Sequence, residues 1–190
     1  MKQEVLFIIL NEYADWESAF LAASLHSGLM PGSEIKYVVK TVAPTLEAVR
    51  SLGGFRTLPD YSFDTMPSDY AGLVLIGGMQ WQFPIVQDAF EKGKVIGGIC
   101  NAASFLCAHG FLNHVKHTGN TLAVLKQWGR EQYTNEDGYL EKQAVGDKNI
   151  VTANGTGYLE FTRELLLALK ADTQEKIEAF YDFSKNGLVR

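Results

Sequence analysis

A single junction sets the architecture of this chain: Gly97-Gly98-Ile99-Cys100-Asn101-Ala102-Ala103. The apolar residues leading into it predict a strand over 94–100, and those after it predict a helix over 102–108 that stops at Gly110. A nucleophilic side chain between strand and helix, with a small residue two positions to either side, is typical of a nucleophile elbow. Here the small residues are Gly98 and Ala102, and the nucleophile is Cys100 in place of serine.

Apolar runs and amphipathic stretches alternate on the N-terminal side of this junction. They predict strands at 5–10, 35–39 and 73–76 and helices at 16–25 and 83–91. Strands that alternate with helices indicate a parallel sheet with helices on both faces.

The C-terminal half follows a different pattern. Residues 126–148 are polar and charged, and the segments 139–145 and 149–153 predict a β-hairpin. A long helical pattern runs from 157 through Leu169, and a final helix is predicted over 173–188. The fold class is therefore α/β, a three-layer αβα sandwich with a mostly parallel central sheet and a small β-hairpin insertion. We expect residues 1–190 to form one domain, because no linker or repeat divides them.

The charge balance argues against several classes of partner. The chain has 17 Lys and Arg against 22 Asp and Glu, a net charge of -5, with no basic cluster. We therefore expect no nucleic-acid partner and no membrane partner. The apolar run near the start is too short to span a bilayer, and residues 1–4 do not resemble a signal peptide. Two cysteines make no disulfide framework, so we expect a cytoplasmic protein with free thiols.

Cys100 is the candidate nucleophile. At a helix N-terminus the unpaired N–H groups and the dipole favour a thiolate, with a pKa between roughly 3.5 and 7.5. The alternative is that Cys100 is a small buried apolar residue. Three acids after the first predicted strand, Glu12, Asp15 and Glu17, are candidates to share its proton, and spacing alone does not choose among them.

Glycines and aromatic residues supply the rest of the candidate site. Backbone N–H groups of Gly77, Gly78 and Asn101 would form an oxyanion hole, unless the glycine pair is only a turn. Trp16 and Trp81 follow predicted strand ends, where they would either wall a small pocket around the sulfur or cover a dimer face.

Metal and cofactor sites are not predicted. His109, His114 and His117 lie within nine residues, but helix-breaking glycines interrupt the segment, so we interpret them as solvated loop side chains. The segment 155–157 lacks the lysine and the spacing of a phosphate-binding loop. Cys107, two helical turns beyond Cys100, is predicted to be core.

Taken in order, these motifs resemble the ThiJ/PfpI family, a branch of the class I glutamine amidotransferase-like superfamily. The resemblance extends over nearly the whole chain and includes residues 51–60 and 68–76, which look like its middle strands. It implies a flavodoxin-like sandwich that forms a homodimer. It also implies that Cys100 is the nucleophile, that Glu17 is the acid beside it, and that the backbone donors are those of Gly77, Gly78 and Asn101.

The chain departs from that family at its histidine positions. Asn101 stands where peptidase-like members have histidine, and Asn120 aligns with the downstream histidine of other members. His117, three residues away, is then the remaining candidate base, with Asn120 as a polar partner.

Three functions follow from this resemblance. The first is a cysteine-dependent enzyme of intracellular protease or amidase type that acts on a small carbonyl or amide substrate. The second is an oxidative-stress or redox-sensing protein without turnover, which uses the same cysteine and needs no histidine. The third is glyoxalase or deglycase chemistry on an aldehyde.

Overall fold

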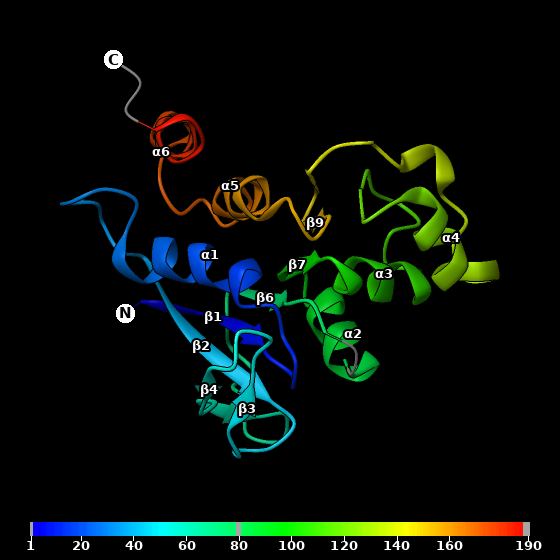
Figure 1. The fold of residues 1–190 in the computed structure, drawn as a ribbon, viewed down its shortest axis with the longest axis horizontal. Coiled ribbons are helices and arrows are strands. Elements are labelled where there is room, and N and C mark those ends of the chain that lie inside the picture. The colour runs from blue at the N-terminus through cyan, green and yellow to red at the C-terminus, as the bar shows by residue number, and fades with distance from the viewer. Residues whose placement is uncertain (1, 79–80, 188–190) are drawn as a thin grey trace.

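The computed structural model describes residues 2–78 and 81–187. Its centre is a seven-stranded sheet in the order β5-β2-β1-β6-β7-β9-β8 (Figure 1). The strands are β1 (Gln3–Ile8), β2 (Tyr37–Ala43), β5 (Tyr61–Ser62), β6 (Gly72–Leu75), β7 (Val95–Ile99), β8 (Ala144–Asp147) and β9 (Ile150–Ala153). Every pairing is parallel except that of β8 with β9. The run β2-β1-β6-β7-β9 is the flavodoxin-like order, so the predicted fold class is confirmed.

Helices cover both faces of this sheet. One face carries α1 (Asp15–Ser27) and α5 (Tyr158–Ala168), and α6 (Gln174–Asn186) packs against them (Figure 1). The other face carries α2 (Phe83–Glu91), α3 (Asn101–Ala108) and α4 (Leu122–Gly129), followed by 3-10 turns at Arg130–Gln132 and Glu136–Gly138. A separate two-stranded antiparallel sheet, β3 (Val49–Arg50) with β4 (Arg56–Thr57), lies outside these layers.

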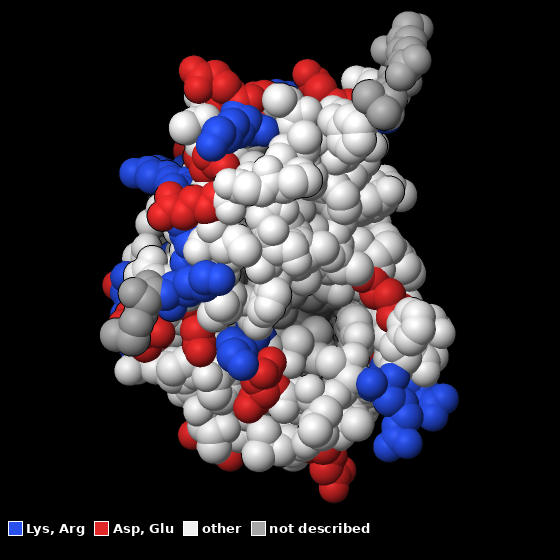
Figure 2. All heavy atoms as spheres, turned by 90° about the vertical axis from the view of Figure 1, so that its left-hand side faces the viewer, with Lys and Arg blue, Asp and Glu red and all other residues white. Residues whose placement is uncertain are grey.

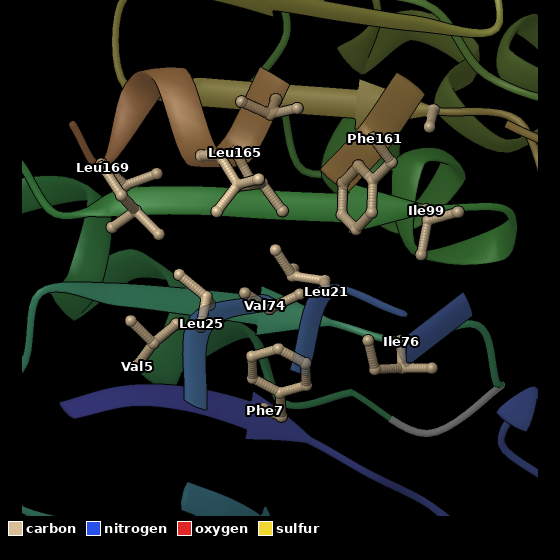
Figure 3. Close-up of a cluster of buried hydrophobic side chains, with 14 of the residues drawn as sticks. Val5, Phe7, Leu21, Leu25, Val74, Ile76, Ile99, Phe161, Leu165 and Leu169 are labelled. Atoms are coloured by element: carbon tan, nitrogen blue, oxygen red, sulfur yellow. The ribbon is translucent and has the colours of Figure 1, made fainter. Parts of the chain in front are cut away.

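The core under α1 and α5 fixes the two helices that flank the candidate site. Figure 3 shows Leu21 and Leu25 of α1 lying over Phe7 of β1, and Phe161 and Leu165 of α5 lying over the strands. All five side chains are buried. Burial of one such side chain stabilises a fold by about 1.5–3 kcal/mol. Tight packing of Leu21 therefore holds the N-terminal half of α1 against the sheet.

Several element boundaries differ from the sequence predictions. β1 covers residues 3–8 instead of 5–10, and β2 covers 37–43 instead of 35–39. The first hairpin strand lies at 144–147, later than the predicted 139–145, and the hairpin extends the main sheet through β9. The segment 51–60, which resembles a middle strand in sequence, instead contributes β4 to the small sheet.

α4 was not predicted. Its residues fall partly in the stretch interpreted as a polar insertion, and four apolar or small residues precede its first lysine. Thr121 caps it, because its Oγ1 accepts a hydrogen bond from the N–H of Val124 at 3.1 Å. The buried Leu125 then ties the helix to the core under α3.

Acidic and basic side chains intermingle on the face shown in Figure 2, mostly along its left margin, and the centre of that face carries few charges. No helix within the described ranges combines the length and the apolar character needed to cross a membrane.

Candidate active site at the carboxyl edge of the sheet

The elbow at Cys100 has the strained geometry that the sequence predicts. Cys100 is the N-cap of α3 and has φ 60° and ψ -124°, in the region where a side chain is sterically costly. Two positions earlier, a Cβ on Gly98 would lie 2.6 Å from the Leu106 side chain and 3.3 Å from the Ala102 backbone. Glycine is therefore required where β7 turns into α3.

The carboxyl ends of β1, β6, β7 and β9 bring the candidate residues together. The loop after β1 leads to Glu17, β6 leads to Gly77, β7 ends at Cys100, and β9 leads to Gly155. Ligands of open α/β sheets bind at this edge, near the point where strand order reverses. In this sheet the reversal lies between β1 and β6.

Glu17 is the acid of the site. Its side chain is 2% exposed, and its Oε2 accepts a hydrogen bond from the Gly77 N–H at 2.8 Å. Its Oε1 is buried and has no N–H or O–H donor among the described residues, and the nearby group able to donate to it is the Cys100 thiol. Burial raises the pKa of Glu17 to about 7, against the opposing effects of Gly77 and Cys100. Near neutral pH this carboxyl can therefore both hold and release a proton.

The other two acids lie elsewhere. Asp15 accepts a hydrogen bond from the N–H of Gly53 at 2.7 Å and so fixes the β3–β4 loop. Glu12 is exposed and has φ 64°. The structure thus brings Glu17 to the sulfur, and neither of its neighbours.

Burial raises the pKa of the Cys100 thiol above its ordinary value. Hydrogen bonds from the Asn120 side chain and the Asn101 backbone oppose this rise, whereas the nearby Glu17 carboxyl adds to it. The expectation of a depressed pKa, drawn from the helix N-terminus, is therefore wrong for the thiol in this geometry. Desolvation outweighs the donors, so formation of the thiolate depends on transfer of the proton to a neighbour.

Asn120 is the side chain that touches the sulfur, with Nδ2 3.4 Å from Cys100 Sγ. Its Oδ1 accepts a hydrogen bond from the Gly155 N–H at 3.0 Å. Because the amide oxygen is occupied by that donor, the NH₂ group is directed at the sulfur. An amide held this way donates a hydrogen bond and cannot act as a base.

Gly155 closes the site from the β9 side. A Cβ at this position would lie 2.9 Å from Cys100 Sγ and 3.2 Å from Glu17 Oε1, so only glycine lets the loop approach both groups. Trp16 donates a hydrogen bond through Nε1 to the Gly155 carbonyl at 3.1 Å and is 49% exposed. Its ring therefore stands at the rim of the site, as one of the two expected pocket residues.

Trp81, the second expected pocket residue, does not line the site. It is 9% exposed and packs against Phe105 in the core under α2 and α3, with ring centroids 5.5 Å apart. The Gly77 N–H also departs from its expected role, because it is committed to Glu17 and not open to an oxyanion. Gly78 follows it and is half-buried, while Met79 and Gln80 lie outside the described residues.

His117 is not a base for Cys100. It is fully buried, with Nδ1 2.9 Å from the Val115 carbonyl and Nε2 2.7 Å from the Tyr133 hydroxyl, so both ring nitrogens are engaged elsewhere. Burial also lowers the pKa of His117, which keeps the ring neutral. The prediction of a solvated loop imidazole is wrong for this residue. Its ring instead joins the loop before α4 to the segment after it.

The remaining histidines are remote from the sulfur or hold structural contacts. His109 is the C-cap of α3, about 14 Å along the helix from Cys100. His26 lies in the last turn of α1, and its Nδ1 accepts from the Val39 N–H. No cluster of three His, Cys, Asp or Glu side chains suited to a metal ion occurs within 2–78 and 81–187. Cys107 is buried and donates to the Leu125 carbonyl at 3.3 Å, as a core residue.

Together, Cys100, Glu17 and Asn120 form a thiol, a proton carrier and a fixed donor in contact. Such a set can form a thiolate by internal proton transfer and stabilise negative charge on or near sulfur. Gly155 approaches this set closely, and the sequence analysis assigns it no place in the site. The available signal was its place directly after β9, the sheet neighbour of the strand that carries Cys100.

Comparison with known proteins agrees with this fold. The chain matches the model of the DJ-1/PfpI family over residues 3–168. It is 39% identical to the uncharacterized protease YdeA of Bacillus subtilis over 97% of this chain and 92% of the relative, and 32% identical to the uncharacterized protease YoaZ of the same organism over 96% and 91%.

Solved structures show the same relationship. A DJ-1 superfamily protein from Agrobacterium tumefaciens superposes with a TM-score of 0.84 at 31% identity, over 98% of this chain and 99% of that one. A ThiJ/PfpI family protein from Bacillus anthracis gives a TM-score of 0.82 at 31% identity, over 97% and 91%. The elbow, the parallel sheet and these matches place the chain in the DJ-1/PfpI family.

Proposed function

We propose that the protein is a cysteine-dependent enzyme that acts on small carbonyl compounds, with Cys100 as nucleophile and Glu17 as proton carrier. The observation that carries this proposal is the set of contacts at Cys100 Sγ, where a fixed amide and a carboxyl with a pKa of about 7 stand in place of an imidazole. Addition of a thiol to an aldehyde needs one proton moved over a short distance, which this pair can supply.

The first step can be written with the groups at hand. The thiol proton passes to the Glu17 carboxylate, the sulfur bonds to the carbonyl carbon, and the π electron pair moves to the carbonyl oxygen. That oxygen then takes the proton back from Glu17, and a hemithioacetal results. Asn120 and the Asn101 N–H lower the cost of the negative sulfur before attack.

Protease-like names among the relatives favour a wider scope that includes amides. Amide cleavage also begins with attack of the thiolate on a carbonyl carbon, but it then needs an acid for the leaving nitrogen and a base for water. Glu17 would have to serve both roles in turn. Aldehyde addition requires only one proton carrier, so we expect it to be the fastest activity.

The test compares loss of methylglyoxal with hydrolysis of a generic amide and ester. We expect wild-type protein to consume the aldehyde, and the Cys100→Ser and Glu17→Gln variants to lose at least about a hundredfold of that rate. Glu12→Gln is the matched control, because Glu12 is an exposed acid five residues from Glu17. If the Cys100→Ser variant consumed the aldehyde at the wild-type rate, the proposal would be refuted. Amide cleavage faster than aldehyde loss would instead assign the protein the protease-like activity.

A second candidate function is reversible oxidation of Cys100. The donors on the sulfur, from Asn120 and the Asn101 backbone, also suit a sulfenate or sulfinate, and a protonated Glu17 can donate to its oxygen. With peroxide as oxidant, each transferred oxygen atom leaves one water. We expect intact mass to rise by whole oxygen atoms on Cys100, and less readily in Glu17→Gln. Oxidation spread over the methionines with Cys100 unmodified would exclude this role.

The assembly we propose is a homodimer through the β3–β4 segment. Four large apolar side chains there are 53–72% exposed, and we call them the β3–β4 patch: Leu46, Leu52, Phe55 and Leu58. Such a cluster on a small domain favours a protein interface. Phe55→Asp should convert a dimer into a monomer in sedimentation, and a monomeric wild-type protein would refute the assignment. Both cysteines are free thiols, which suits the reducing cytoplasm as the proposed location.

A further inference from the structure

A cavity lies at the sheet edge opposite to Cys100. Its volume is about 210 Å³, and it sits where β7 and β9 begin. The end of α2, the turn after α3 and the β8–β9 turn complete its walls. α2 and α3 lie side by side on this face of the sheet (Figure 1). None of the residues assigned to the candidate active site lines it.

The walls of this cavity are apolar. Five side chains form them: Phe90, Ile96, Phe111, Val115 and Ile150. The rings of Phe90 and Phe111 lie 5.3 Å apart at an angle of 56°, and Phe90 is 45% exposed. An apolar cavity of about 150 Å³ is large enough to take up benzene, so this one has room for an aromatic ring and a short substituent.

Two lysines give the cavity a positive rim. Lys148 is exposed and donates through Nζ to the His114 carbonyl, a neutral acceptor, at 2.9 Å. Lys94 lies 5.3 Å from the centre of the Tyr70 ring, and the acid near it is Asp69, whose side chain is 96% exposed and 3.8 Å away. Both lysines line the cavity in a chain with a net charge of -5. An apolar pocket with a few polar groups at its rim is the usual form of a small-molecule site.

We propose that this cavity binds a small aryl carboxylate, with the ring against the two phenylalanines and the carboxylate toward Lys94 and Lys148. The positive charge of the two lysines favours an anionic ligand, and the apolar wall favours contact with an aromatic ring. The site is independent of Cys100, because it occupies the start of β7 while Cys100 follows the end of that strand.

The test is a titration of the whole protein with phenylacetate, followed by amide chemical shifts in NMR. We expect saturable shifts centred on Gly93, Gly110 and Ile150. Phenylacetamide, which keeps the ring and removes the charge, should bind about threefold to tenfold more weakly, as expected for partly exposed ion pairs. The double variant Lys94→Gln with Lys148→Gln should abolish that difference.

Lys92→Gln is the matched control, because Lys92 pairs with Asp88 outside the cavity and should leave the acid–amide difference intact. Val115→Phe should fill the cavity and remove binding of both compounds. If that variant does not fold, the double lysine variant still tests the proposal, because Lys148 is exposed and Lys94 is only partly buried. Equal affinity for acid and amide, or shifts centred at the Cys100 edge, would overturn the proposal.

Discussion

Ionisation of Glu17 should make the fold less stable as pH rises. The folded state raises the pKa of this carboxyl from its ordinary 4.5 to about 7, so between these values the folded protein keeps a proton that the unfolded chain has lost. Stability contributed by the neutral acid is complete below about pH 4.5 and is lost as pH rises through 7. The direction is opposite to that of a salt-bridged carboxylate, whose folded-state pKa is lowered.

The magnitude follows from the size of this change. Each tenfold difference in acid strength corresponds to about 1.4 kcal/mol, so a rise from 4.5 to about 7 corresponds to about 3 kcal/mol. Glu17 is 2% exposed, so solvent screens little of this cost. Glu17→Gln keeps the shape and stays neutral, and should therefore remove this part of the pH dependence.

The assay is urea unfolding at intervals from pH 4.5 to 8, in a Cys100→Ser background that removes thiol titration and oxidation. The protein that retains Glu17 is compared in this background with its Glu17→Gln variant, and all other groups cancel in the difference between the two. We expect the free energy of unfolding of the Glu17 protein, relative to its Glu17→Gln variant, to fall by about 3 kcal/mol from pH 4.5 to pH 8. A difference constant to within about 0.5 kcal/mol would refute the reasoning, because additive effects agree to that level.

Three further substitutions test the remaining contacts. Asn120→Asp replaces the donor with a negative group and should move alkylation of Cys100 by iodoacetamide to higher pH; an unchanged profile would remove Asn120 from the site. Gly155→Ala places a methyl group 2.9 Å from the sulfur and should slow alkylation and cost about 1–3 kcal/mol in urea unfolding, and a neutral effect on both would contradict the close approach. Tyr133→Phe leaves Nε2 of the buried His117 without its partner and should cost about 1–3 kcal/mol, with no change in alkylation rate. A slowed alkylation there would point to a role of His117 at the sulfur.

The sequence predicts those elements whose structure depends on residues close together in the chain. The elbow at Cys100 was predictable because the turn requires small residues on either side, and the side chains that would clash with larger ones are close in sequence. Apolar runs located the central strands for the same reason, since strands buried on both faces carry continuous apolar residues. The sequence pattern does not predict α4, because the start of this helix depends on the Thr121 cap and its packing depends on one buried apolar residue, Leu125.

The parts of the site that were missed depend on contacts far apart in the chain. Glu17 and Gly77 are 60 residues apart, and spacing alone did not separate Glu17 from Glu12 or Asp15. His117 and Asn120 stand three residues apart in one loop, yet only Asn120 turns toward the sulfur. That choice depends on the N–H of Gly155, 35 residues further on, which no local pattern encodes.

The hydrogen bond between Gly155 and the amide of Asn120 has an evolutionary consequence. A neutral imidazole at position 120 that accepted from the same N–H through one nitrogen would carry its proton on the other nitrogen, and so would face the sulfur as a donor, as the amide does. Asparagine and histidine codons differ at a single nucleotide. A lineage with this scaffold can therefore exchange asparagine for histidine by one point mutation and keep a donor at the sulfur, but to gain a base there it must also turn the Gly155 N–H away from position 120.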